Sequence, residues 1–152
     1  MTYEERLKKL KLPSLTYRRL RGDMIEVYKL LHGKYDPEAA SLLKLRKDYA
    51  PKYALRGHDL TLLQQRARLN LRKYSFTFRV VSTWNSLPAA VVQAPSINAF
   101  KNRLDKYWRN EDFVYNYKAP YTGGQRLNVN YEEDEELTIE AMPAVRNIRE
   151  VT

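Results

Sequence analysis

The amino-acid sequence predicts a mainly α fold: a small helical domain with one short β-hairpin, followed by a poorly ordered acidic tail. Three observations support this prediction. Apolar residues recur at helical spacing over several stretches, and one segment alternates apolar and basic residues as strands do. Beyond Asn110 both patterns stop. We therefore assign residues 1–110 to a basic helical domain and residues 111–152 to an acidic, Tyr-rich tail that we expect to be flexible.

The N-terminal third of the chain predicts three helices. Residues 3–12 form the first, and Pro13 ends it. Ser14 is placed to cap a second helix over 15–32. Its apolar stripe consists of Leu20, Met24, Val27, Tyr28 and Leu31. Gly22 lies inside this helix, which suggests close packing or a local break. Asp36 followed by Pro37 is typical of the start of a short third helix.

The middle of the chain predicts the hairpin. Residues 44–58 have little periodicity and read as a connecting loop. Residues 60–63 and 67–72 then show strand-like alternation. In an extended strand the basic side chains of residues 66–72 would share one face, about 6.7 Å apart, and the apolar side chains would share the other.

Helical spacing returns after the hairpin. Residues 76–87 predict a helix that ends at Pro88, and residues 89–93 predict one further helical turn. Ser96 is placed to cap a last helix, in which Ile97, Phe100, Leu104, Tyr107 and Trp108 share a face.

The net charge of +9 hides a division within the chain. Residues 1–110 hold 23 Lys and Arg against 9 Asp and Glu, a net +14, whereas residues 111–152 hold 4 against 9, a net −5. A surplus of +14 exceeds the net charge of about 2–8 that solubility needs. The asymmetry favours a domain that binds a polyanion and carries an acidic tail.

Several classes of function are excluded or disfavoured by composition. Without cysteine the chain has no disulfide, thiolate zinc site, iron–sulfur cluster or cysteine nucleophile. Its two histidines lie 26 residues apart and form no recognisable metal or catalytic motif. We therefore expect no enzyme activity, cofactor or metal. No apolar run approaches a membrane span and no signal-peptide pattern is present, so we expect an intracellular protein, cytoplasmic or nuclear, without a membrane partner.

Basic residues in three clusters are the candidate nucleic-acid-binding residues. The first lies on the second strand of the predicted hairpin and just after it, where a row of guanidinium groups could follow a phosphate backbone. The second lies early in the second helix, and the third on the polar face of the last helix. They are Arg66, Arg68, Arg72, Lys73 and Arg79; Arg18, Arg19 and Arg21; and Lys101 and Arg103. The alternative for each cluster is a solvated surface without a ligand.

Three stretches, read together, resemble a known family. They are RRLRGDMIEVYKLLHG at 18–33; RGH at 56–58 with RLNLRK at 68–73 and FRVVSTWNSLP at 78–88; and APSINAFKNRLDKYW at 94–108. They resemble the C-terminal segment, downstream of the polymerase palm, of the reverse transcriptase polyprotein of non-long-terminal-repeat, LINE-type retrotransposons. The resemblance covers about residues 7–108. It implies an accessory region that helps to hold template RNA or target DNA.

No catalytic residue carries over from this resemblance. The family's polymerase requires a Tyr-x-Asp-Asp motif, and this chain has no Asp-Asp pair. The first hypothesis is therefore a non-catalytic fragment that binds the RNA or DNA backbone. The second is a protein-interaction or structural module, which would brace a reverse transcriptase palm or self-associate and would expose Trp84 or Trp108. A third is a remnant reading frame without selected function.

Overall fold

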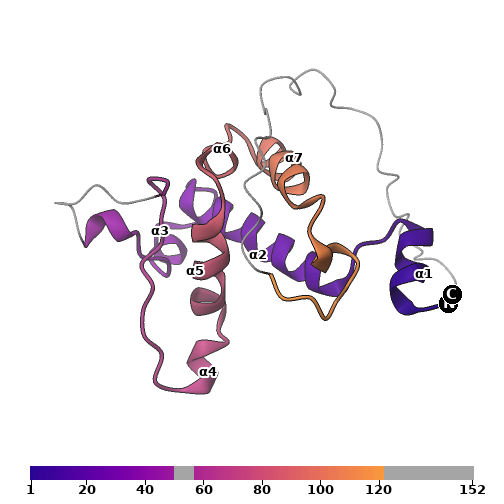
Figure 1. The fold of residues 1–152 in the computed structure, drawn as a ribbon. Coiled ribbons are helices and arrows are strands. Elements are labelled where there is room, and N and C mark those ends of the chain that lie inside the picture. Colours follow the sequence, from indigo (N-terminus) through magenta and orange to yellow (C-terminus); the bar gives the residue numbers. More distant parts are fainter. Residues whose placement is uncertain (50–56, 122–152) are drawn as a thin grey trace, which may run out of the picture.

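A computed structural model describes residues 1–49 and 57–121 of the chain. Within those ranges the fold is mainly helical, as predicted, and it is organised around helix α2, Leu15–Leu31. Helices α5, Phe76–Ser86, and α7, Ile97–Trp108, both pack against α2 (Figure 1). The side chains at the centre of this packing are almost completely buried: Met24, Val27, Tyr28, Val80, Trp84, Phe100, Leu104 and Trp108. This core supplies most of the driving force for folding.

Polar caps define where the first two helices begin. Helix α1, Tyr3–Leu10, starts with a capping box in which Thr2 and Glu5 satisfy each other's backbone N–H groups. Helix α2 starts at Ser14, whose hydroxyl accepts a hydrogen bond from the Tyr17 N–H, as the sequence predicted. Gly22 neither breaks α2 nor packs closely, because a Cβ atom placed there would meet nothing within 4 Å.

Short helices and turns connect α2 to α7. They are α3, Pro37–Ala40; the 3₁₀ turn η1, Arg46–Asp48; α4, Asn70–Lys73; and α6, Ala89–Val92. Helix α6 packs against α7, and Ser96 caps α7 by accepting a hydrogen bond from the Ala99 N–H. That cap was also predicted from the sequence.

The predicted β-hairpin is wrong. Residues 67–72 do not form a strand, and the last three of them belong to the helical turn α4. Across the described residues the one β-type contact is an isolated antiparallel bridge between Leu45 and Leu62. The alternation misled because Leu69 and Leu71, which a strand would bury on one face, are instead 71% and 89% exposed.

The side chain of Asn85, near the end of α5, forms the backbone hydrogen bonds with Leu62 that a neighbouring strand would form. The Leu62 N–H donates to the Asn85 Oδ1 atom at 2.8 Å, and the Asn85 Nδ2 atom donates to the Leu62 carbonyl at 2.9 Å. The Trp84 indole N–H also donates to the Leu60 carbonyl, at 2.9 Å. Side chains of α5 therefore satisfy a backbone segment that a second strand would otherwise pair.

Residues 111–121 continue the packed structure beyond the boundary predicted near residue 110. The turn η2, Asp112–Val114, packs against α2, and Phe113 is 1% exposed. Ser14 fixes this turn: its hydroxyl donates to the Phe113 carbonyl and its backbone N–H donates to the Val114 carbonyl, each at 2.6 Å. The predicted flexible tail otherwise falls on residues 122–152, which lie outside the described ranges.

None of the helices within the described ranges is long and apolar enough to cross a lipid bilayer.

Candidate nucleic-acid interface

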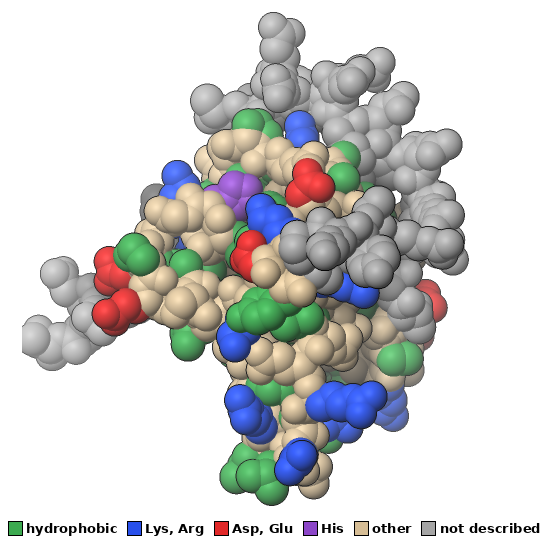
Figure 2. All heavy atoms as spheres, turned by 90° about the vertical axis from the view of Figure 1, so that its left-hand side faces the viewer, with side chains coloured by type: hydrophobic (Ala, Val, Ile, Leu, Met, Phe, Trp, Pro, Cys, Tyr) green, Lys and Arg blue, Asp and Glu red, His purple; other side chains and the backbone are tan. Residues whose placement is uncertain are grey.

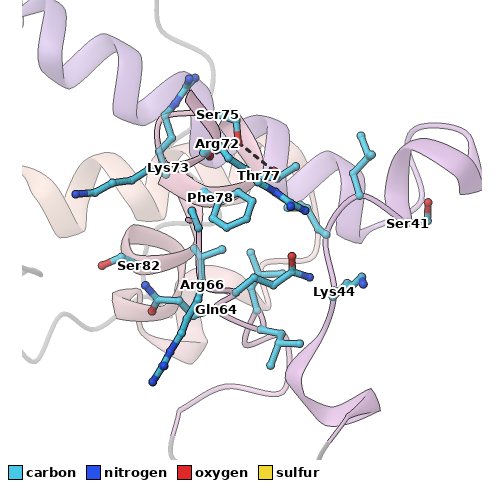
Figure 3. Close-up of a pocket in the computed structure, with 18 residues that line it drawn as sticks. Ser41, Lys44, Gln64, Arg66, Arg72, Lys73, Ser75, Thr77, Phe78 and Ser82 are labelled. Carbon is cyan, nitrogen blue, oxygen red and sulfur yellow. Dashed lines mark hydrogen bonds between the residues drawn. The ribbon is translucent and has the colours of Figure 1, made fainter. Parts of the chain in front are cut away.

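A groove of about 1010 Å³ lies beside α4 and α5. Three segments line it: residues 41–44 after α3, residues 62–67, and residues 72–82 (Figure 3). Leu43, Leu62 and Val81 contribute buried apolar side chains to its lining. Its cationic side chains are those of Lys44, Arg66, Arg72, Lys73 and Arg79, and we call this site the basic groove.

The described residues that line the basic groove include no carboxylate. The sequence explains this, because no Asp or Glu occurs between Asp59 and Asp105. Lys44, Arg66, Arg72 and Lys73 are all exposed, and none forms an ion pair with a described residue. Four cations with no ion-pair partner among the described residues produce a positive potential, which attracts a polyanion.

Aromatic rings lie next to the cations of α4. The Arg72 guanidinium carbon lies 5.3 Å from the centre of the Phe78 ring, and the Lys73 ammonium lies 5.8 Å from that of Tyr74. Cation–π contacts at these distances restrict long side chains without neutralising them. The two cations are therefore held beside the groove with their charge available.

Neutral polar groups supply further hydrogen-bonding capacity. Gln64, Gln65, Ser75, Thr77 and Ser82 line the groove together with the cations. Gln64 and Lys44 come from the segments that face α4 and α5 in Figure 3. The amides and hydroxyls can donate to phosphate and sugar oxygens, as such groups commonly do in nucleic-acid complexes.

Arg79 lines the groove but already has an anionic partner. Its Nε and Nη2 atoms donate to the two carboxylate oxygens of Asp23 at 2.9 and 2.8 Å. These hydrogen bonds raise the pKa of Arg79, and the pair joins α5 to α2. Arg79, which the sequence predicts as a phosphate contact, thus holds two helices together through this pair.

Arg21 lies outside the basic groove, on the side of α2 that meets α7. It donates to Asp105 through Nε at 2.6 Å and through Nη2 at 2.8 Å, and the Tyr17 hydroxyl donates to the same carboxylate at 2.7 Å. Burial and the hydrogen bond to Asp105 raise the pKa of Tyr17. The role of Arg21 in the structure is therefore to connect α2 to α7 through Asp105.

The other predicted site residues are not brought into the groove. Arg68 is exposed beside it but is not among its lining residues. Arg18 and Arg19 are exposed on α2, and Lys101 is half-buried on α7. Arg103 donates to the Ala90 carbonyl at 2.8 Å. The structure therefore gathers Arg66, Arg72, Lys73 and Arg79 along the groove, and the residues of the second and third clusters are not among those that line it.

Lys44 and the two glutamines were not predicted from the sequence. Lys44 was assigned to a loop without periodicity, and residues 64 and 65 lay between the two expected strands. Their position depends on the Leu45–Leu62 bridge, which brings two irregular segments together. No local sequence pattern predicts such a contact.

The surface around α4 combines basic and apolar side chains. Figure 2 shows Lys and Arg gathered at the lower end of the molecule around exposed hydrophobic groups, with no Asp or Glu visible there. Leu69, Leu71 and Tyr74 are the exposed large apolar residues of this segment. The tryptophans expected to be exposed in a bracing module, Trp84 and Trp108, are both completely buried.

His58 lies inside the fold. Its Nε2 atom is 3.3 Å from the Trp84 carbonyl, and its Nδ1 atom has no hydrogen-bond partner among the described residues. Because a carbonyl only accepts, Nε2 carries the proton. Burial lowers the pKa of His58. No group of three or more His, Cys, Asp or Glu side chains suited to a metal ion occurs within residues 1–49 and 57–121.

Comparison of the chain with protein-family models, with curated proteins and with solved structures found no match in any of the three.

Proposed function

We propose that this chain is a non-catalytic nucleic-acid-binding fragment derived from a retrotransposon reverse transcriptase, and that the basic groove holds the phosphate backbone of its ligand. The observation that carries the proposal is the groove lining, in which the part of the chain that the structure describes places four exposed cations and no carboxylate. A backbone that carries one charge per nucleotide matches such a row of cations. Binding of this kind is independent of sequence and weakens as salt rises.

The proposal assigns the phosphate contacts to Lys44, Arg66, Arg72 and Lys73. Arg79 borders the same groove and would add a contact without leaving Asp23. Arg18, Arg19, Lys101 and Arg103 are left as a diffuse positive surface that attracts the ligand from a distance. The family resemblance of residues 7–108 supports the same assignment, because it implies a region that holds template RNA or target DNA.

Equilibrium binding of a labelled 20-nucleotide RNA of mixed sequence, measured by fluorescence anisotropy over a range of salt concentrations, tests the proposal. The test variant is Arg66→Gln/Arg72→Gln/Lys73→Gln in the full chain. The matched control is Arg6→Gln/Lys8→Gln/Lys9→Gln, which removes the same charge from exposed positions on α1, a helix far from α4 in Figure 1.

The expected result is a loss of affinity of about tenfold or more in the groove variant, and a much smaller loss in the control. The slope of log Kd against log salt should fall by about two in the groove variant, at about 0.7 per phosphate contact on single strands. Equal losses in the two variants, or wild-type binding that does not respond to salt, would overturn the proposal.

A further inference from the structure

The helical turn α4 carries an exposed apolar projection next to the basic groove. Leu69, Leu71 and Tyr74 are 71%, 89% and 67% exposed, and we call residues 69–74 the α4 tip. Figure 1 places α4 at the far end of the molecule from α6 and α7, beyond the end of α5 against which it packs. Large apolar side chains gathered on an exposed projection are typical of a binding surface.

The charges of the tip restrict what can cover these side chains. Arg72 and Lys73 lie within the tip, Arg68 precedes it, and the nearest carboxylates in the sequence are Asp59 and Asp105. A second copy of this region would bring like charges together, which is unfavourable. The occupant should therefore present apolar faces and negative charge close together.

Single-stranded nucleic acid has this combination, because each nucleotide combines a flat base with a charged phosphate. Aliphatic and aromatic side chains bind bases by stacking or insertion, and neighbouring cations bind the phosphates. In a duplex the base faces are already stacked on one another, so a protein must unstack them before it can contact them. An exposed tip of this composition favours the unpaired strand.

The geometry joins the tip to the groove. Arg72 and Lys73 belong to both, and Arg72 is held over Phe78, a groove-lining ring. Resting on the proposed function, we infer that the site takes single-stranded RNA or DNA, with phosphates along the basic groove and unpaired bases against Leu69, Leu71 and Tyr74. The tip thereby sets the preference for unpaired over paired strands.

The test compares a labelled 20-nucleotide single strand with the duplex of the same sequence, using the full chain. The test variants are Leu69→Ser/Leu71→Ser and Tyr74→Ala. The control is Leu10→Ser/Leu15→Ser, which removes two leucines that are 65% and 69% exposed near α1. Thermal unfolding checks that all the variants fold, which is expected because every replaced side chain is exposed.

The wild type should bind the single strand more tightly than the duplex. Each tip variant should weaken single-strand binding by about fivefold or more while leaving duplex affinity and the salt slope unchanged. The control should match the wild type. Equal effects on both ligands, or no effect on either, would overturn this inference.

One comparison of these variants and one further measurement separate the ways in which these ideas can fail. If the charge variant of the groove loses affinity but the tip variants do not, the inference fails and the proposed function stands; if neither loses affinity, both fail. Co-sedimentation with vesicles of phosphatidylserine and phosphatidylcholine tests a lipid surface instead. Vesicle binding that is lost in the tip variants, with single-strand binding retained, would assign the tip to a membrane and overturn the inference.

Discussion

Arg79 on α5 and Asp23 on α2 form a two-pronged ion pair, with N–O distances of 2.9 and 2.8 Å, at the border between the helical core and the basic groove. The Asp23 side chain is 12% exposed and that of Arg79 is 33% exposed, so the carboxylate is largely removed from solvent while the arginine stays partly in contact with it. The same guanidinium lies 5.7 Å from the centre of the Phe76 ring. The groove wall is therefore fastened to α2 by a charged contact.

The first prediction concerns this pair. Asp23→Asn, Arg79→Gln and the double variant form a double-mutant cycle. Urea unfolding should give a coupling free energy of about 1–2 kcal/mol, which is less than a fully buried ion pair would give because Arg79 is partly exposed to solvent. The Lys29–Glu26 pair on the surface of α2, at 2.9 Å, serves as a control and should couple more weakly. Coupling at Asp23–Arg79 no larger than in the control would contradict the assigned role.

The second prediction concerns Asn85. Asn85→Ala leaves the N–H and carbonyl of Leu62 without partners, and each unpaired buried group costs about 1–3 kcal/mol. The free energy of unfolding should fall by about 2 kcal/mol, and the Leu62 amide should exchange its hydrogen faster. Asn102→Ala, at an exposed position on α7, should change the free energy by less than about 0.5 kcal/mol. Similar losses in the two variants would show that Asn85 does not hold this segment.

The third prediction uses two glycines, each with open space where a Cβ atom would lie. Gly22→Ala should raise the free energy of unfolding by about 1 kcal/mol, because alanine favours a helix interior. Gly33→Ala should lower it by roughly 1–2 kcal/mol, because residue 33 has φ +66° and a side chain is strained there. Thermal or urea unfolding measures both, and a destabilised Gly22→Ala would mean that α2 is not a regular helix at this point.

The fourth prediction is a pH dependence from His58. Burial lowers the pKa of His58 in the folded protein and outweighs two opposing effects, those of the hydrogen bond to the Trp84 backbone and of the nearby Asp59 carboxylate. The unfolded chain, with a histidine pKa of about 6.5, then binds more protons than the folded chain as pH falls. The contribution of neutral His58 to the free energy of unfolding should be fully present above about pH 6.5 and should decline below it.

His58→Gln provides the control for this pH dependence. A glutamine amide can donate to the Trp84 carbonyl but does not titrate, so the decline between about pH 7 and 5.5 should become shallower. Unfolding free energies measured at half-unit intervals of pH give the comparison. An unchanged slope in the variant would assign the acid sensitivity to other groups.

The helices were predictable because their signals are local. Ser14 and Ser96 cap the helices that they were expected to cap, and the apolar stripe of α2 faces the core. The hairpin was not predictable in the same way, because alternation also arises in an exposed segment. Leu69 and Leu71 alternate with basic residues without being buried on a sheet face.

The candidate site was predictable only as a segment. The basic stretch around residues 66–73 was identified, but as a strand face instead of a helical turn bordering a groove. Some of the predicted cations form ion pairs with carboxylates that are distant in sequence: Arg21 pairs with Asp105 and Arg79 pairs with Asp23. Such pairings need the packed arrangement of α2, α5 and α7, which periodicity does not specify.

The double role of Ser14 has a consequence for how the chain acquires its structure during synthesis. The residue that starts α2 also binds the backbone of residues 113 and 114, which leave the ribosome about a hundred positions later. Contacts across so long a loop form slowly, since closing the loop costs entropy before the contact is made. The beginning of α2 therefore waits, without its final partners, until the last part of the described fold has been translated.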